Sequence, residues 1–230
     1  MNSVLRVFKD MWVYVSQKMD STTSRVLLVY FVSWLSWPLW TFYISDWVGT
    51  VVYDGDPSAP EGTTSRDNYN DGVEMASFSL FLYSIVAFVY SILIPYIIKL
   101  KFLGHRSAWA GAMFFHSFIY IALILIHNKI FTMIMISLAG VNLATMHVVP
   151  WALVGFATAP SDNGVAFAIV NVCNAVPSLI LNGFVNPLLE YLFSTLIPAM
   201  IFGAATMFIA GLLVFFVKPL SDYPLYNKQK

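Results

Sequence analysis

The sequence predicts an all-α polytopic membrane protein with six transmembrane helices. Of its 230 residues, 59% are hydrophobic and only 10% are charged, and the mean hydropathy is +0.73. Soluble domains carry about 25% charged residues, so a water-soluble fold could not bury this much apolar surface. Apolar stretches of membrane-spanning length recur six times, and the basic residues gather at alternate ends of these stretches.

The predicted order begins with a short amphipathic cytosolic lead-in at 1–24, which lacks the continuous apolar core and cleavage site of a signal peptide. A helix of about 20 apolar residues crosses the roughly 30 Å hydrocarbon layer of a bilayer. The predicted spans, in chain order, are 25–45, 75–98, 107–126, 130–149, 165–184 and 195–217. They form a six-helix transmembrane bundle at 25–217, and a cytosolic tail follows at 218–230.

The longest connection, 46–74, is predicted to be a solvated external loop. It is rich in acidic residues, glycine, proline, serine and asparagine. A calcium site built from Asp54, Asp56 and Glu61 is the alternative, but their spacing matches no EF-hand. We therefore favour the solvated loop.

The orientation follows from the lysines and arginines, because positive charges near span ends stay in the cytosol. With the N-terminus inside, only Arg66 and Lys129 of the 12 basic residues lie outside. Both termini are therefore expected in the cytosol. The plasma membrane and an internal acidic organelle both fit this multi-pass topology.

A polar stripe runs along the fifth span. Asn171, Asn174, Ser178 and Asn182 advance by three or four residues and fall within an arc of about 80° on a helix. Lipid chains cannot form hydrogen bonds with an amide side chain, so the stripe is expected to face other helices or a water-filled cavity. Two readings stay open, a pathway lining for a solute and an amide contact that joins helices. Pro177, within the stripe, predicts a bent or loosened helix.

Tryptophans follow one another through the first span. Trp34, Trp37 and Trp40 advance by three residues, and indole faces pack well on the C–H side of a sugar ring. The alternative, strongest for Trp47, is the aromatic belt at the membrane interface. Pro38, in the middle of the span, predicts a break in the helix.

Asp46 is the candidate for proton coupling, because a partly desolvated carboxylate can take up and release a proton near neutral pH. In the fourth span, Asn142 and Thr145 share a face that could meet the asparagine stripe of the fifth. His116 and His147 lack the spacing of a metal site, and Cys173 is the only cysteine. The sequence thus predicts no metal, no cofactor, no enzyme activity and, with zero net charge, no nucleic-acid partner.

Four runs carry a family resemblance. The residues 37–57 resemble the seventh helix and following loop of the plant sucrose carriers and their animal relatives, the proton-associated sugar transporters. The runs 69–75 and 150–154 are similar to the family's entry into its eighth helix and the end of its tenth. The run 171–177 resembles part of its eleventh, with Ser178 where glutamine is usual. The similarity extends over nearly the whole chain.

The resemblance implies a major facilitator fold of the glycoside-pentoside-hexuronide:cation symporter branch, which moves sucrose or related glucosides with protons. Such carriers have two six-helix halves with the substrate between them, and this chain looks like the C-terminal half, helices 7 to 12. At Thr50, Val51 and Glu74 it departs from the plant pattern towards the animal members. Plant-like coupling is therefore less strongly implied.

The resemblance also implies a missing partner. We favour a longer polypeptide in which an N-terminal six-helix half precedes this chain, and the alternative is a half-transporter that pairs with a second six-helix chain. Membrane lipid and a small sugar are the other expected partners. The competing functional hypothesis is a non-transporting membrane subunit, a truncated regulatory relative of a full carrier. A non-sugar solute is a further alternative, because a fold does not fix its substrate.

Overall fold

The computed structural model describes residues 2–99, 104–193, 195–219 and 223. Within these residues the chain is helical and contains no strand. The α-helices are α1 (Asn2–Val13), α2 (Ser21–Trp34), α3 (Trp37–Trp47), α4 (Thr64–Ile97), α5 (Gly104–Leu125), α6 (Lys129–Leu138), α7 (Gly140–Ala157), α8 (Asn163–Ile180), α9 (Asn186–Leu192) and α10 (Ile197–Val214). Short π-helical segments are Tyr14–Lys18, Val48–Val52 and Leu181–Val185.

Six helical stretches of the described chain are long and apolar enough to cross a membrane. They are Ser21–Val52, Thr64–Ile97, Gly104–Leu125, Lys129–Ala157, Asn163–Leu189 and Ile197–Val214. The predicted fold class is confirmed, and the arrangement is consistent with one half of a major facilitator fold. The chain is therefore an integral multi-pass membrane protein.

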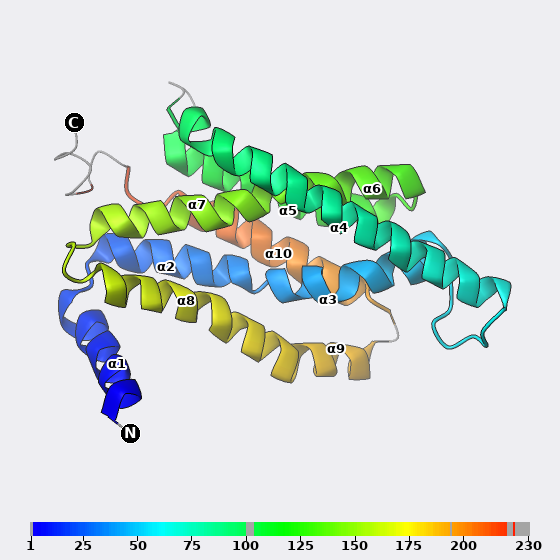
Figure 1. The fold of residues 1–230 in the computed structure, drawn as a ribbon, viewed down its shortest axis with the longest axis horizontal. Coiled ribbons are helices and arrows are strands. Elements are labelled where there is room, and N and C mark those ends of the chain that lie inside the picture. The colour runs from blue at the N-terminus through cyan, green and yellow to red at the C-terminus, as the bar shows by residue number, and fades with distance from the viewer. Residues whose placement is uncertain (1, 100–103, 194, 220–222, 224–230) are drawn as a thin grey trace.

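The six spans run roughly along the long axis of the molecule (Figure 1). The start of α2 and the end of α10 lie at the same end of the bundle, which we call the terminal end. The connections from α3 to α4 and from α9 to α10 lie at the opposite end, which we call the distal end. An even number of spans produces this arrangement.

The first span is broken where the sequence predicts it. The α2 helix ends at Trp34, and α3 begins at Trp37 with Pro38 in its first turn, because proline has no amide hydrogen to continue the ladder. Tyr120 of α5 fixes this bend through two hydrogen bonds to Ser36. The Ser36 hydroxyl donates to the Tyr120 hydroxyl at 3.1 Å, which in turn donates to the Ser36 carbonyl at 3.1 Å.

The connection predicted as a loop at 46–74 is largely helical. The first span continues through Val48–Val52, and α4 begins at Thr64, so only 53–63 is irregular. Two features explain the difference. Thr63 caps α4 by accepting from the Arg66 amide, and Gly72 lies so close to Gly49 that a Cβ on Gly72 would be 2.7 Å from the Gly49 Cα. Polar composition alone does not prevent a helix that is capped and packed at its end.

The segment predicted as a lead-in contains α1 and the start of α2. Most of the predicted tail at 218–230 lies outside the described residues, as do three of the lysines used to predict the orientation. These are Lys101, Lys228 and Lys230.

Asp20 starts the first span as its N-cap. Its carboxylate accepts a hydrogen bond of 2.8 Å from the Thr23 amide. Burial raises the pKa of Asp20, but the bonds from Thr23 and Thr22 outweigh it, so the pKa lies below its ordinary value. A carboxyl group whose pKa is depressed by folding stabilises the fold above its unfolded-state pKa, and this contribution is lost as the pH falls through the folded-state pKa.

We therefore expect Asp20→Ala to lower the free energy of unfolding by about 1 kcal/mol at neutral pH. The difference from the unaltered chain should shrink as the pH falls below the ordinary range of an aspartate, about 4. Thermal unfolding in detergent micelles at several pH values measures both effects. Asp10→Ala, at an exposed position of α1, is the control. A difference that stays constant down to acidic pH would contradict the role of the cap.

Candidate functional site

The structure separates the predicted site residues into three places. Trp37, Trp40 and Asn142 lie in or beside a cluster in the middle of the bundle. Asn171, Asn174 and Ser178 lie on α8, and Asp46 lies at the distal end.

A histidine stands at the centre of the buried cluster. The amide nitrogen of Asn142 donates to Nδ1 of His116 at 3.0 Å, and the Trp40 indole meets the imidazole edge to face, with 4.7 Å between ring centroids. Asn142 is 0% exposed and Trp40 1%. No solute reaches either side chain in this conformation, so direct contact with a substrate stays a prediction for them.

The predicted meeting of Asn142 with the asparagine stripe is wrong. Its side chain lies between α7 and α5, where His116 supplies the bond that a buried amide needs. The sequence assigns His116 no role, because its spacing fits no metal site. The one signal that could have found it is that an ionisable group inside a span is rare and costly.

Trp37 lies at the edge of this cluster and is half-buried. Its ring centroid lies 6.1 Å from that of Tyr83 on α4 and 6.5 Å from that of His116. The interface-belt reading of Trp47 is wrong, because the indole is 1% exposed within the bundle and packs against His127 at 6.1 Å. The first span continues past Trp47 through the π-helical segment Val48–Val52, so the indole does not lie at the end of the span.

The polar stripe lies on a poorly covered side of α8. Asn171 and Asn182 are exposed, and Asn174 and Ser178 are half-buried. Asn171 donates to the carbonyl one turn earlier at 3.2 Å, and Ser178 donates to the Asn174 carbonyl at 3.3 Å. The stripe continues for one further turn, where the Asn186 amide donates to Asn182 Oδ1 at 3.0 Å. These bonds stay within one span and do not join it to a neighbouring helix.

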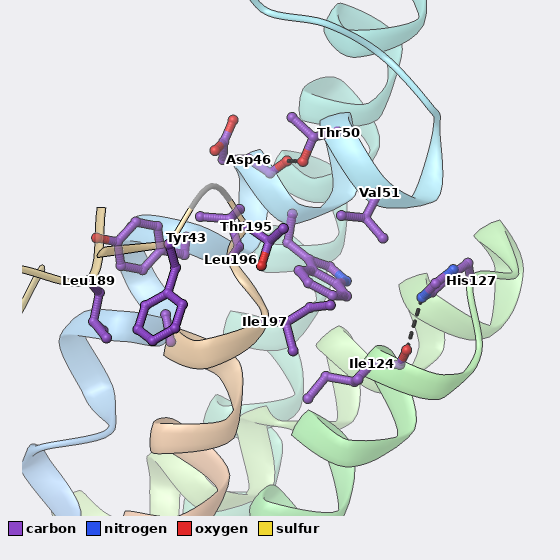
Figure 2. A pocket seen from close by; sticks show the side chains of 13 residues that line it. Tyr43, Asp46, Thr50, Val51, Ile124, His127, Leu189, Thr195, Leu196 and Ile197 are labelled. Carbon is purple, nitrogen blue, oxygen red and sulfur yellow. Dashed lines mark hydrogen bonds between the residues drawn. The ribbon is translucent and has the colours of Figure 1, made fainter. Parts of the chain in front are cut away.

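Asp46 lies between two pockets at the distal end. One, of about 530 Å³, is mainly apolar and is lined by Tyr43, Trp47 and His127 among others; we call it the aromatic pocket. Figure 2 shows Asp46 and Thr50 on one side of it and His127 on another. The second, of about 590 Å³, is lined by Tyr43 and Asp46 together with four more polar side chains, and we call it the amide pocket. These are Ser45, Tyr69, Asn182 and Asn186.

The amide pocket joins the Asp46 carboxylate to the end of the α8 stripe. The Tyr69 hydroxyl donates to Asp46 Oδ1 at 3.0 Å. Glycines make room for this tyrosine, since a Cβ on Gly49 would lie 2.7 Å from its ring and one on Gly55 2.3 Å from its amide nitrogen. The sequence reading missed Tyr69 and Asn186. Asn186 could have been found by continuing the stripe four residues beyond Asn182.

The chemistry of the amide pocket suits a neutral, hydroxyl-rich solute. A carboxylate and two amides accept and donate directional hydrogen bonds, and a tyrosine adds an apolar ring face. No group of three or more histidine, cysteine, aspartate or glutamate side chains in the described residues is arranged to hold a metal ion.

Comparison with known proteins gives this chemistry a context. No family model matches the chain. It is 28% identical over 219 residues to sucrose transport protein SUT1 of rice (Oryza sativa subsp. japonica), a match that takes in 84% of this chain and 39% of the relative. It is 26% identical over 213 residues to sucrose transport protein SUT5 of rice (subsp. indica), with 82% and 39% covered.

The chain is thus similar to the sucrose transport proteins over most of its length. A third relative is solute carrier family 45 member 3 of the mouse (Mus musculus), 27% identical over 136 residues, which are 59% of this chain and 24% of the relative. The chain thus spans about two fifths of the length of its rice relatives. The predicted resemblance to the sucrose and proton-associated sugar transporter family is confirmed, and these homologues are transporters by name.

Proposed function

We propose that this chain is the C-terminal six-helix part of a secondary-active sugar carrier, which moves sucrose or a related glucoside or hexose by alternating access. One observation carries the proposal. The polar stripe of α8 is only partly covered by the six-helix bundle, with Asn171 and Asn182 exposed, and lipid cannot satisfy the hydrogen bonds of such groups. A second six-helix bundle over this face, with a water-filled cavity between the two, would satisfy them.

In this proposal the amide pocket lies at the distal mouth of the cavity, and Asp46 carries the coupling proton. The carboxylate is half-buried, is held by Tyr69, and lies beside amides that can bond to sugar hydroxyls. With both termini cytosolic, the mouth opens to the outside of a cell or to the lumen of an acidic organelle. The missing bundle belongs to the same polypeptide or to a second chain, and no cofactor other than the proton is required.

Uptake by reconstituted protein tests the function. The complete carrier, in which this chain is joined to or assembled with the second six-helix bundle, should accumulate labelled sucrose or glucose in proteoliposomes with an inward proton gradient. A protonophore should abolish the accumulation. Folded assemblies that take up no sugar would contradict the proposal. Inert protein that co-purifies with a larger carrier would indicate the non-transporting subunit instead, and competition by non-sugar solutes would indicate another substrate.

Two substitutions test the site within the same assay. We expect Asp46→Asn to abolish proton-driven accumulation, because an amide cannot take up the coupling proton, and Asn174→Ala to lower the apparent affinity for sugar by removing a hydrogen-bonding group from the cavity face. The amount of protein in the vesicles should not change in either. Asp67→Asn, also near the distal end but absent from both pockets, is the matched control. Normal accumulation by Asp46→Asn would exclude Asp46 as the coupling group.

A further inference from the structure

The α1 helix presents an apolar face that the bundle does not cover. Leu5, Phe8 and Trp12 advance by three and four residues and therefore share one side of the helix. They are 58%, 63% and 73% exposed. Figure 1 shows α1 leaving the terminal end obliquely to the long axis of the bundle. Exposed large apolar side chains grouped in this way indicate a binding surface.

The opposite side of this segment is fixed to the bundle. Tyr14 is buried, and its hydroxyl lies 3.1 Å from the Thr158 hydroxyl oxygen, within hydrogen-bond distance. Lys18 forms an ion pair of 2.8 Å with Asp162. Thr158 and Asp162 belong to the turn between α7 and α8, where the fourth candidate span ends and the fifth begins. The two contacts therefore hold α1 at the level at which spans leave the membrane.

We propose that α1 lies in the plane of the membrane surface, with Leu5, Phe8 and Trp12 inserted into the boundary between headgroups and acyl chains. The bilayer is the occupant that the position favours, because the apolar face begins beside the exposed outer surface of the six spans and is anchored where that surface ends. An amphipathic helix with large apolar residues on one side and basic residues at its border binds membranes in this way.

The charges on α1 agree with a lipid partner. Lys9 borders the apolar face on a helical wheel, Arg6 lies further round on the same side, and Asp10 lies nearly opposite the face. Long basic side chains can keep their stems on apolar surface while their charged ends reach phosphate groups. The indole of Trp12 prefers the same interfacial layer. A second protein bundle is the competing occupant, and it would leave these basic groups without the phosphates that suit them.

Two positions of similar exposure allow a matched test. Leu5 is 58% exposed and Val7 52%, but they lie on different sides of α1. Cys173 is the only cysteine of the chain, so Cys173→Ser provides a background in which Leu5→Cys and Val7→Cys each carry one fluorescent label. The labelled chain is reconstituted in vesicles of phosphatidylcholine and phosphatidylserine. Its emission is then quenched either by brominated phospholipid or by aqueous iodide.

We expect brominated lipid to reduce the emission at position 5 and iodide to leave it unchanged, with the reverse pattern at position 7. Adding Phe8→Glu to the Leu5→Cys chain should remove the quenching by brominated lipid, because the carboxylate withdraws the face from the bilayer. Equal quenching of both positions by iodide would overturn the proposal. A label at position 5 that neither quencher reaches would mean that protein covers the face, and would also overturn it.

Discussion

Replacing Gly140 by valine is expected to disrupt the packing of α7 against α4. A Cβ at this position would lie 2.2 Å from the Tyr83 carbonyl oxygen and 2.9 Å from the Ala87 amide nitrogen. Both are backbone atoms of α4, so the contact cannot be relieved by turning a side chain. Small residues allow this kind of close approach between membrane helices, and α7 must move away if the residue grows.

The expected size of the effect is that of a strongly overpacked core, about 1–3 kcal/mol or more of lost stability. Thermal unfolding of the purified chain in detergent measures it as a lower midpoint. Gly111→Val is the matched control, because Gly111 also lies within a helix and a Cβ there would meet nothing within 4 Å. If the two variants unfold at the same temperature, the close contact between α4 and α7 does not exist as described.

The packing of α4 against the first span at the distal end shows why the sequence does not predict every part of the fold. Apolar runs of bilayer length predict the spans, and Pro38 predicts the break before α3, because both depend only on local sequence. The polar composition of 46–74 predicts a loop. In the structure, Gly49 and Gly72 allow α4 to pack against the first span there, and a contact between distant segments leaves no local signal.

The candidate site likewise has features that the local sequence predicts and features that depend on contacts between distant segments. Periodicity predicted the stripe of Asn171, Asn174 and Ser178 on one face of α8, and that face is poorly covered. The direction in which Asn142 points was not predictable, because α7 is apolar nearly all around and its rotation depends on its neighbours. The pairing of Tyr69 with Asp46 joins two helices across 23 positions of the chain, and only the tertiary structure brings them together.

Trp40→Ala is expected to have the largest effect on stability among the aromatic substitutions of the first span. The indole is fully buried and packs edge to face against His116 and against Tyr120, with centroid distances of 4.7 and 5.2 Å. Removing a buried tryptophan leaves a cavity and typically costs about 3–5 kcal/mol. Trp12→Ala, at an exposed indole, should leave the unfolding midpoint in detergent unchanged.

A second substitution at Trp40 distinguishes a supporting role of the indole from direct contact with sugar. Trp40→Phe keeps an aromatic ring in the core and should restore most of the lost stability. If Trp40 only supports the bend held by Ser36 and Tyr120, the phenylalanine variant should transport sugar with an unchanged apparent affinity. A several-fold weaker affinity at an unchanged unfolding midpoint would instead show that the indole reaches the sugar in another state of the transport cycle. Such a state would have to open the core between α3 and α5, because in the present one His116 and Tyr120 cover the ring.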